Sequence, residues 1–129
     1  MVVGQFSQET DLVVIGGGPA GYIAAFRAAE LGVSTVIVDS REDGALGGVC
    51  LHDGCIPSKT LLHIAELINQ SQRGAEFGIT LPKPKVDFAA VRAWKDQTIK
   101  KLAAGLEASC KKHGVERITG RAHFEDSRN

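Results

Sequence analysis

The hydrophobic positions of the chain form short continuous runs near the N-terminus. Residues 11–15 (DLVVI) and 34–38 (STVIV) are runs typical of buried parallel strands. The Ala-rich segment 22–31 between them favours a helix, and Gly32 is placed to end it. Strand, helix and strand occupy residues 10–39, the length of one βαβ unit. The pattern predicts an α/β fold with a parallel sheet.

Further along, the apolar positions recur at helical spacing. The segment 47–72 contains a helical stripe of leucine and isoleucine between Leu61 and Ile68. A loop rich in glycine and proline is expected over residues 73–86. Asp87 is a predicted N-cap for a long helix over 87–113, which Gly114 ends. A third strand is predicted at 115–119.

Composition and charge narrow the function classes. A chain of 129 residues suits one domain, and 15 Lys plus Arg balance 15 Asp plus Glu, so neither nucleic acid nor a membrane is an expected partner. No apolar run approaches the roughly 20 residues of a membrane-spanning helix. The first ten residues contain no Lys or Arg and predict no targeting peptide. Three cysteines without an export signal indicate a reducing compartment: the cytoplasm, or the mitochondrial matrix if a leader has been removed.

A glycine motif, Gly16-x-Gly18-x-x-Gly21, connects the first predicted strand to the first predicted helix. In a dinucleotide fold the first glycine makes the turn, the second lets a pyrophosphate approach, and the third allows close packing of helix and strand. Asp39, at the end of the second strand, would accept hydrogen bonds from ribose hydroxyls. The alternative is a structural turn that binds nothing, and the motif does not choose between FAD and NAD.

Pro19 and Ala20 occupy the first turn of the helix that follows the glycines. Proline is well suited to this position because its missing N–H would have no helical partner. The N–H groups that remain free at a helix N-terminus attract phosphate.

Cys50 and Cys55 lie five positions apart in the segment 47–59 (GGVCLHDGCIPSK). They could form half of a zinc site, be two buried thiols, or be a redox pair. Zinc is disfavoured because the chain offers no matching second ligand pair, so no metal is expected. A disulfide needs Cα atoms within about 7 Å, whereas residues five apart in a regular helix are about 8–9 Å apart. The redox hypothesis therefore requires an interrupted helix, for which Gly54 and Pro57 provide the means.

The segment GGVCLHDGCIPSKTLLH resembles the active-site helix of the flavoprotein disulfide reductases, most of all the dihydrolipoamide dehydrogenases. The segments VVIGGGPAGYIAAFRAAELG and VRAWKDQTIKKLAAGL extend the resemblance over nearly the whole chain. It implies a Rossmann-like FAD-binding domain, truncated before its second half, with the NAD and interface domains absent from these 129 residues. Mercuric, glutathione-type or other flavoprotein disulfide reductases remain alternatives. So does a non-catalytic nucleotide-binding module.

The resemblance also implies residue roles. Cys50 would be the interchange thiol, Cys55 would lie nearer the flavin, and Lys59 would lie near the flavin N5. Asp39 stands where the family more often has Glu, and Val49 where Thr is common. The residues implied to contact FAD are Gly16, Gly18, Pro19, Ala20, Gly21, Asp39, Ser40, Arg41, Gly47, Gly48, Val49, Cys50, Lys59 and Ala122.

The activity implied by the resemblance is FAD-dependent oxidation of protein-bound dihydrolipoamide to lipoamide. The Cys50–Cys55 disulfide would take the electrons, and NAD⁺ would be the final acceptor in a homodimeric full-length enzyme. The expected partners are the lipoyl domains of 2-oxoacid dehydrogenase complexes. The 129 residues alone are expected to lack turnover.

Overall fold

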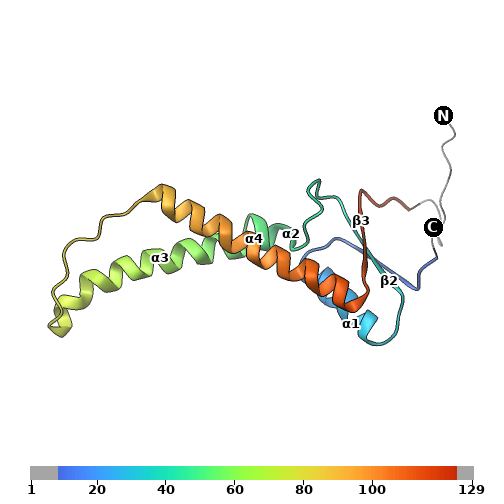
Figure 1. The fold of residues 1–129 in the computed structure, drawn as a ribbon, viewed down its shortest axis with the longest axis horizontal. Coiled ribbons are helices and arrows are strands. Elements are labelled where there is room, and N and C mark those ends of the chain that lie inside the picture. Colours follow the sequence, from blue (N-terminus) through green and yellow to red (C-terminus); the bar gives the residue numbers. More distant parts are fainter. Residues whose placement is uncertain (1–8, 125–129) are drawn as a thin grey trace. The chain divides into compact units, whose positions relative to one another are not determined.

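The computed structural model of the chain describes residues 9–124, so the expectation for the first ten residues falls largely outside the described range. The chain divides into two compact units, one with residues up to Gly48 and from Leu106 onward, the other with Val49–Gly105. The elements, coloured along the chain in Figure 1, are β1 (Leu12–Ile15), α1 (Pro19–Glu30), β2 (Thr35–Asp39), α2 (Gly48–His52), α3 (Cys55–Arg73), the 3-10 helix η1 (Gly74–Phe77), α4 (Phe88–His113) and β3 (Glu116–Thr119).

The first unit contains a three-stranded parallel sheet in the order β1-β2-β3. In the register of this sheet, Val14 pairs with Ile37, and Ile37 pairs with Arg117. Helix α1 packs against β1 and β2. The expected α/β fold with a parallel sheet is confirmed.

The core of this unit lies on the face of the sheet that carries Ile37. Ile37 is fully buried, and the other buried members of the cluster are Ala25, Leu46, Cys110 and Val115. Ala25 comes from α1 and Cys110 from the last turns of α4, so both helices contribute to this core. Gly32 (φ 83°) and Gly114 (φ 67°) follow the two helices in the left-handed conformation that favours glycine.

The opposite face of the sheet differs from the expectation of a strand buried on both sides. Val13 is 51% exposed, Ile15 is 55% exposed and Ile118 is 41% exposed. Successive side chains of a strand point to opposite faces, and on this face the central strand is covered, with Val36 of β2 only 4% exposed, while β1 and β3 are exposed. The apolar run at residues 11–15 therefore predicted a strand correctly, but one face of that strand is exposed, whereas residues 35–37 of the run at 34–38 are buried as expected.

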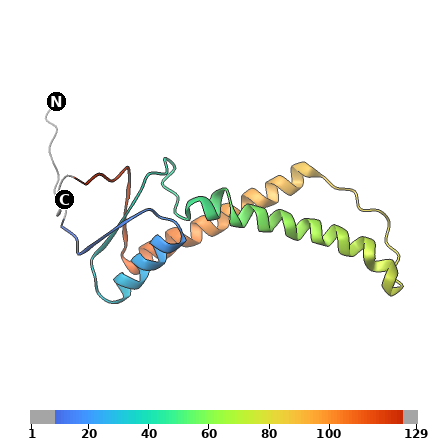
Figure 2. The same cartoon turned by 180° about the vertical axis from the view of Figure 1, so that it is seen from behind.

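The second unit consists of α2, α3, η1 and the part of α4 up to Gly105, with residues 78–87 joining η1 to α4 (Figure 2). Asp87 caps α4, because its Oδ1 accepts hydrogen bonds from the N–H groups of Ala89 (2.9 Å) and Ala90 (3.1 Å). The segment 47–72 forms two helices, separated by Asp53 and Gly54, so the interruption lies between the two cysteines. Among the described residues no helix is both long and apolar enough to cross a membrane.

Candidate nucleotide-binding turn and dithiol pair

The glycine motif forms the connection from β1 to α1. Gly16 has φ 98°, in the region that favours glycine, and its N–H donates to the carbonyl of Val38 at 2.8 Å. A Cβ at Gly21 would collide with the carbonyl oxygen of Gly16, whereas a Cβ at Gly18 would meet no atom within 4 Å. The turn therefore requires glycine at position 21 for packing and leaves open space beside position 18.

Helix α1 begins at Pro19, and Gly18 is its N-cap. No side chain caps this end, and no acidic residue lies in the first turn. The N–H groups of the first turn of a helix have no helical partner and carry a partial positive charge. The N-terminus of α1 is therefore free to bind an anion next to the open side of Gly18.

Asp39 organises this turn from the end of β2. Its Oδ2 accepts a 2.5 Å hydrogen bond from the N–H of Gly17, and its Oδ1 accepts a 2.8 Å hydrogen bond from the N–H of Arg41. The predicted role of Asp39 was to bind a ribose. An ionised carboxylate has about four acceptor sites, so the two backbone bonds leave capacity for ribose hydroxyls.

The loop after β2 returns to the glycine turn. The N–H of Gly47 donates to the carbonyl of Gly17 at 2.8 Å. A Cβ at Gly48 would lie 2.9 Å from the Cα of Gly18, so the two backbones approach closely. The structure thus brings together four predicted cofactor residues, Gly16, Gly18, Gly47 and Gly48.

Four further residues predicted to contact FAD lie in the loop after β2 (Ser40 and Arg41), in α2 (Val49) and after β3 (Ala122). The side chain of Arg41 pairs with Asp43, with its Nε 2.9 Å from Oδ1. Ser40 is exposed, and Val49 is 73% exposed. Ala122 is partly buried after β3, whose end is tied to Asp39 by a 2.8 Å bond from the N–H of Gly120 to the Asp39 carbonyl.

In the second unit, the two cysteines flank the break between α2 and α3. Gly54 has φ −123° and ψ −102°, which is not helical. A Cβ at Gly54 would lie 3.1 Å from the carbonyl oxygen of Val49 and 3.7 Å from the Cα of Cys50. The missing side chain therefore lets the start of α3 approach α2, as the redox hypothesis requires.

The cysteines are free thiols in contact with each other. A side-chain hydrogen bond to Cys55 raises the pKa of the Cys50 thiol, and burial and the charge of a Cys55 thiolate act in the same direction. A backbone hydrogen bond from Cys55 and the positive charge of Lys59 lower that pKa, with smaller effects. In the reduced pair, Cys50 therefore holds its proton to a higher pH than an isolated thiol would.

Ser58 stabilises the break. Its hydroxyl donates to the carbonyl of Gly54 at 2.7 Å, and its N–H donates to the same carbonyl at 3.1 Å. These two bonds stabilise the first turn of α3, which carries Cys55 and leads to Lys59, the residue after Ser58. The role of Ser58 was not predicted, although a serine four residues after a helix break is a local signal for such a bond.

Two other contributions were missed because they depend on tertiary contacts. A Cβ at buried Gly17 would collide with Leu46 and approach Asp39. Arg117 on β3 bonds to Gly44 in the loop after β2 and pairs with Glu107 on α4. No short-range pattern marks residues that meet across 73 positions.

Cys110 is separate from the pair. It is only 2% exposed, and burial raises the pKa of its thiol. Between residues 9 and 124, no cluster of three or more His, Cys, Asp or Glu is arranged to hold a metal ion.

Comparison with known proteins places these features in a family. Residues 10–129 match the family model described as pyridine nucleotide-disulphide oxidoreductase. The chain is 46% identical over 127 residues to a dihydrolipoyl dehydrogenase of Geobacillus stearothermophilus, which covers 98% of this chain and 26% of the relative. It is 44% identical over 127 residues to that of Bacillus subtilis (strain 168), with the same coverage.

A dihydrolipoyl dehydrogenase of Buchnera aphidicola subsp. Schizaphis graminum (strain Sg) is 47% identical over 116 residues, covering 90% of this chain and 24% of the relative. The chain therefore spans about a quarter of the length of the curated relatives it matches. With the family model covering all but the first nine residues, and with the glycine turn and the adjacent thiols in place, the chain belongs to the pyridine nucleotide-disulphide oxidoreductase family.

Proposed function

We propose that this chain supplies the FAD-binding turn and the redox dithiol of a dihydrolipoamide dehydrogenase. The observation that carries the proposal is the contact between Cys50 and Cys55 across the helix break at Gly54. Two thiols held together at an interrupted helix can exchange between dithiol and disulfide. Names of relatives at 44–47% identity support dihydrolipoamide as the substrate.

The residues of the first unit fit FAD. The diphosphate would lie against the open side of Gly18, where the N-terminus of α1 supplies N–H groups and a partial positive charge. Asp39 would accept hydrogen bonds from the ribose, while it continues to hold the N–H groups of Gly17 and Arg41. When bound, FAD supplies the redox chemistry that links the dithiol to a nicotinamide.

The dithiol performs the exchange with the substrate. Starting from the Cys50–Cys55 disulfide, a substrate thiolate attacks the sulfur of Cys50, and Cys55 leaves as a thiolate. The second substrate thiolate then attacks the substrate sulfur bound to Cys50, which releases Cys50. The substrate loses two electrons and two protons and becomes the cyclic disulfide. The protein pair gains the two electrons, Cys50 takes up one proton, and the other proton is released to water.

The surroundings of Cys50 suit its role as the sulfur that exchanges with the substrate. Its raised pKa means that the released sulfur takes up a proton readily, which opposes its renewed attack on the product. Lys59 favours the thiolate form of Cys50 through its charge and thereby limits this effect. Cys55 is the partner that we assign to the flavin side.

In the whole protein, we propose NAD⁺ as the final electron acceptor and a homodimer as the working form. Lipoyl domains of 2-oxoacid dehydrogenase complexes are the proposed partners. The 129 residues alone are expected to have no NADH:lipoamide turnover. A second candidate, a nucleotide-binding module without redox activity, shares the glycine turn but gives no role to the contact between the thiols.

Flavin binding and thiol titration test the proposal together. The purified chain is mixed with FAD, and the absorbance of protein-bound flavin and the number of reactive thiols are measured before and after oxidation. The expected result is bound flavin with the loss of two reactive thiols, reversed by a dithiol reductant. Cys50→Ser with Cys55→Ser is the matched control and should bind flavin without the reversible change.

Flavin binding without reversible loss of the two thiols would favour the nucleotide-binding module. Failure to bind flavin at any accessible concentration would contradict the FAD role. The substrate is tested separately in the whole protein by comparing reduced lipoamide with glutathione and Hg²⁺.

A further inference from the structure

The loop between β2 and α2 carries three residues proposed to contact FAD, Ser40, Arg41 and Gly47, but no helix or strand of its own. The start of the loop is held by Asp39, which accepts a hydrogen bond from the N–H of Arg41. The end of the loop is held by the hydrogen bond from the N–H of Gly47 to the carbonyl of Gly17. Within the loop, the N–H of Gly44 donates to the carbonyl of Arg41 at 2.9 Å and forms a turn. The position of this turn therefore determines where the backbone groups at both ends of the loop lie relative to the nucleotide site.

Arg117 fastens the turn to the body of the first unit. Its Nη1 donates to the carbonyl of Gly44 at 2.6 Å, and its Nη2 lies 2.6 Å from Oε2 of Glu107 on α4. The side chain of Arg117 is 29% exposed and that of Glu107 is 36% exposed. Partly shielded, charge-assisted bonds of this length are stronger than neutral bonds at the surface.

The pairing of β3 with β2 determines the position of Arg117. Arg117 pairs with Ile37 in the sheet and shares the face that α1 and α4 cover. Glu107 lies one turn before the buried Cys110 on α4. Gly44 has φ 65°, and a Cβ on it would lie 3.1 Å from the hydroxyl of Thr119, so the turn lies close to β3.

We propose that Arg117 is a positioning residue for the nucleotide site, held in place by Glu107. It fixes residues 40–47 in the conformation that receives the adenosine and diphosphate parts of FAD. The inference rests on the FAD role proposed above. A loop fixed before binding loses less conformational freedom when the ligand binds, which increases affinity without any new contact to the ligand.

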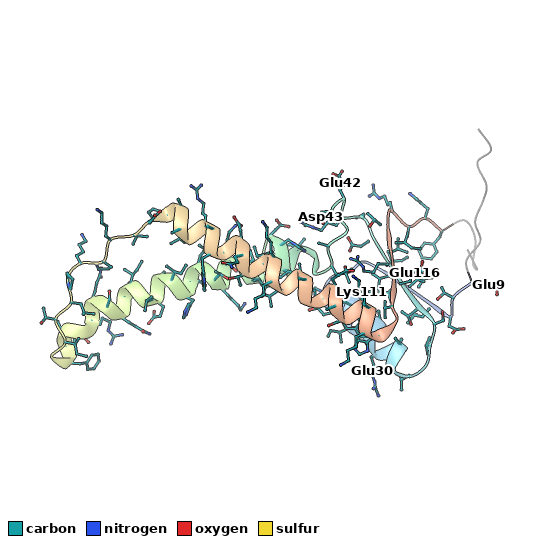
Figure 3. All side chains as sticks on the ribbon, in the orientation of Figure 1. Glu9, Glu30, Glu42, Asp43, Lys111 and Glu116 are labelled. Atoms are coloured by element: carbon teal, nitrogen blue, oxygen red, sulfur yellow. The ribbon has the colours of Figure 1, made fainter. Side chains whose placement is uncertain are left out.

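A second cation beside Glu107, the side chain of Lys111, provides a matched control. Its Oε1 lies 3.7 Å from Nζ of Lys111, whose side chain is 77% exposed and does not bond to the loop. Figure 3 labels Lys111 on α4 and Asp43 in the loop. Lys111→Gln therefore removes a cation from the same carboxylate without releasing Gly44.

Hydrogen exchange of the chain without FAD tests the loop directly. Arg117→Gln should raise the exchange of the amides of Gly44, Ala45 and Gly47 and leave that of β1 and α1 unchanged. Arg117→Lys, which offers one nitrogen for two partners, should give a smaller increase. Lys111→Gln should leave the loop unchanged. Equal exchange in the loop of Arg117→Gln and the unaltered protein, or an increase spread evenly over the sheet, would overturn the inference.

FAD titration tests the consequence for binding. Arg117→Gln should weaken FAD binding about five- to twentyfold, in keeping with the loss of one charge-assisted bond and the ordering of a short loop on binding. Lys111→Gln should bind as the unaltered protein does. If the unaltered protein and Arg117→Gln bind FAD with the same affinity, this inference is overturned and the proposed function is not. If the unaltered protein binds no FAD, the proposed function is overturned as well.

Discussion

The carboxylate of Asp39 accepts a hydrogen bond from the backbone N–H of Gly17, with 2.5 Å between nitrogen and oxygen. Gly17 is buried, so its N–H has no alternative partner in water. The residue proposed to bind the ribose therefore also holds the glycine turn that would receive the diphosphate. Loss of Asp39 would affect the site even before a ligand arrives.

We expect Asp39→Ala to lower the free energy of unfolding by about 1–3 kcal/mol, because it leaves the buried Gly17 N–H unsatisfied. Asp39→Asn should cost less, since its amide oxygen can still accept one of the two backbone bonds. Urea denaturation without FAD measures both. Glu42→Gln, at an exposed position in the following loop, is the control for loss of negative charge. Equal stability of Asp39→Ala and the unaltered protein would contradict the assigned role.

The pair of thiols has a pH dependence that follows from their contact. Because Cys55 raises the pKa of Cys50, a smaller fraction of Cys50 is thiolate at neutral pH than for an isolated thiol. We expect Cys55→Ala to move the pKa of Cys50 down towards its ordinary value and to speed its alkylation at pH about 7 severalfold, since a thiolate is the reactive form. The measurement is the rate of reaction with iodoacetamide as a function of pH.

Lys59→Met should act in the opposite direction, because the charge of Lys59 lowers the pKa of Cys50. The rate profile of this variant should shift to higher pH. An identical profile for the unaltered protein and both variants would show that the three side chains do not interact in solution.

Cys110 should behave differently from the pair. It is 2% exposed and its pKa is raised by burial, so it should react with a thiol reagent only after denaturation. In the native reduced chain we expect two accessible thiols, and in the denatured reduced chain three. Rapid labelling of three thiols in the native chain would contradict the packing of α4 in the core.

The glycines of the chain separate into those that packing requires and those that it does not. Gly21→Ala would place a Cβ against the carbonyl of Gly16 and 3.3 Å from Val14, and overpacking of this kind costs about 1–3 kcal/mol. Gly105→Ala, in the interior of α4, would meet no atom within 4 Å and should stabilise the chain by about 0.5–1 kcal/mol. Thermal unfolding of both variants checks the contrast; a stabilised Gly21→Ala would contradict the geometry of the turn.

Features governed by local chemistry could be predicted from the sequence. The strands, the caps at Gly32, Asp87 and Gly114, and the glycine turn depend on residues close in the chain. The interruption between Cys50 and Cys55 followed from bond geometry, because an intact helix would hold the thiols too far apart.

Features governed by distant residues could not be predicted in this way. An apolar run such as β1 indicates a strand but does not say which faces are covered, so the exposure of Val13 and Ile15 was missed. The bond from Arg117 to Gly44 depends on how β3 and the loop meet in the folded sheet. The burial of Gly17 depends on where Leu46 packs.

The non-helical backbone at Gly54 bears on how quickly the thiols could be used. The side chains of the reduced pair already share a hydrogen bond across the break, so oxidation would not require a helix to unwind. Repeated cycles would therefore dissipate little energy in rearranging the polypeptide. The break between α2 and α3 is formed when the chain folds, so it would not have to form again each time the pair is oxidised or reduced.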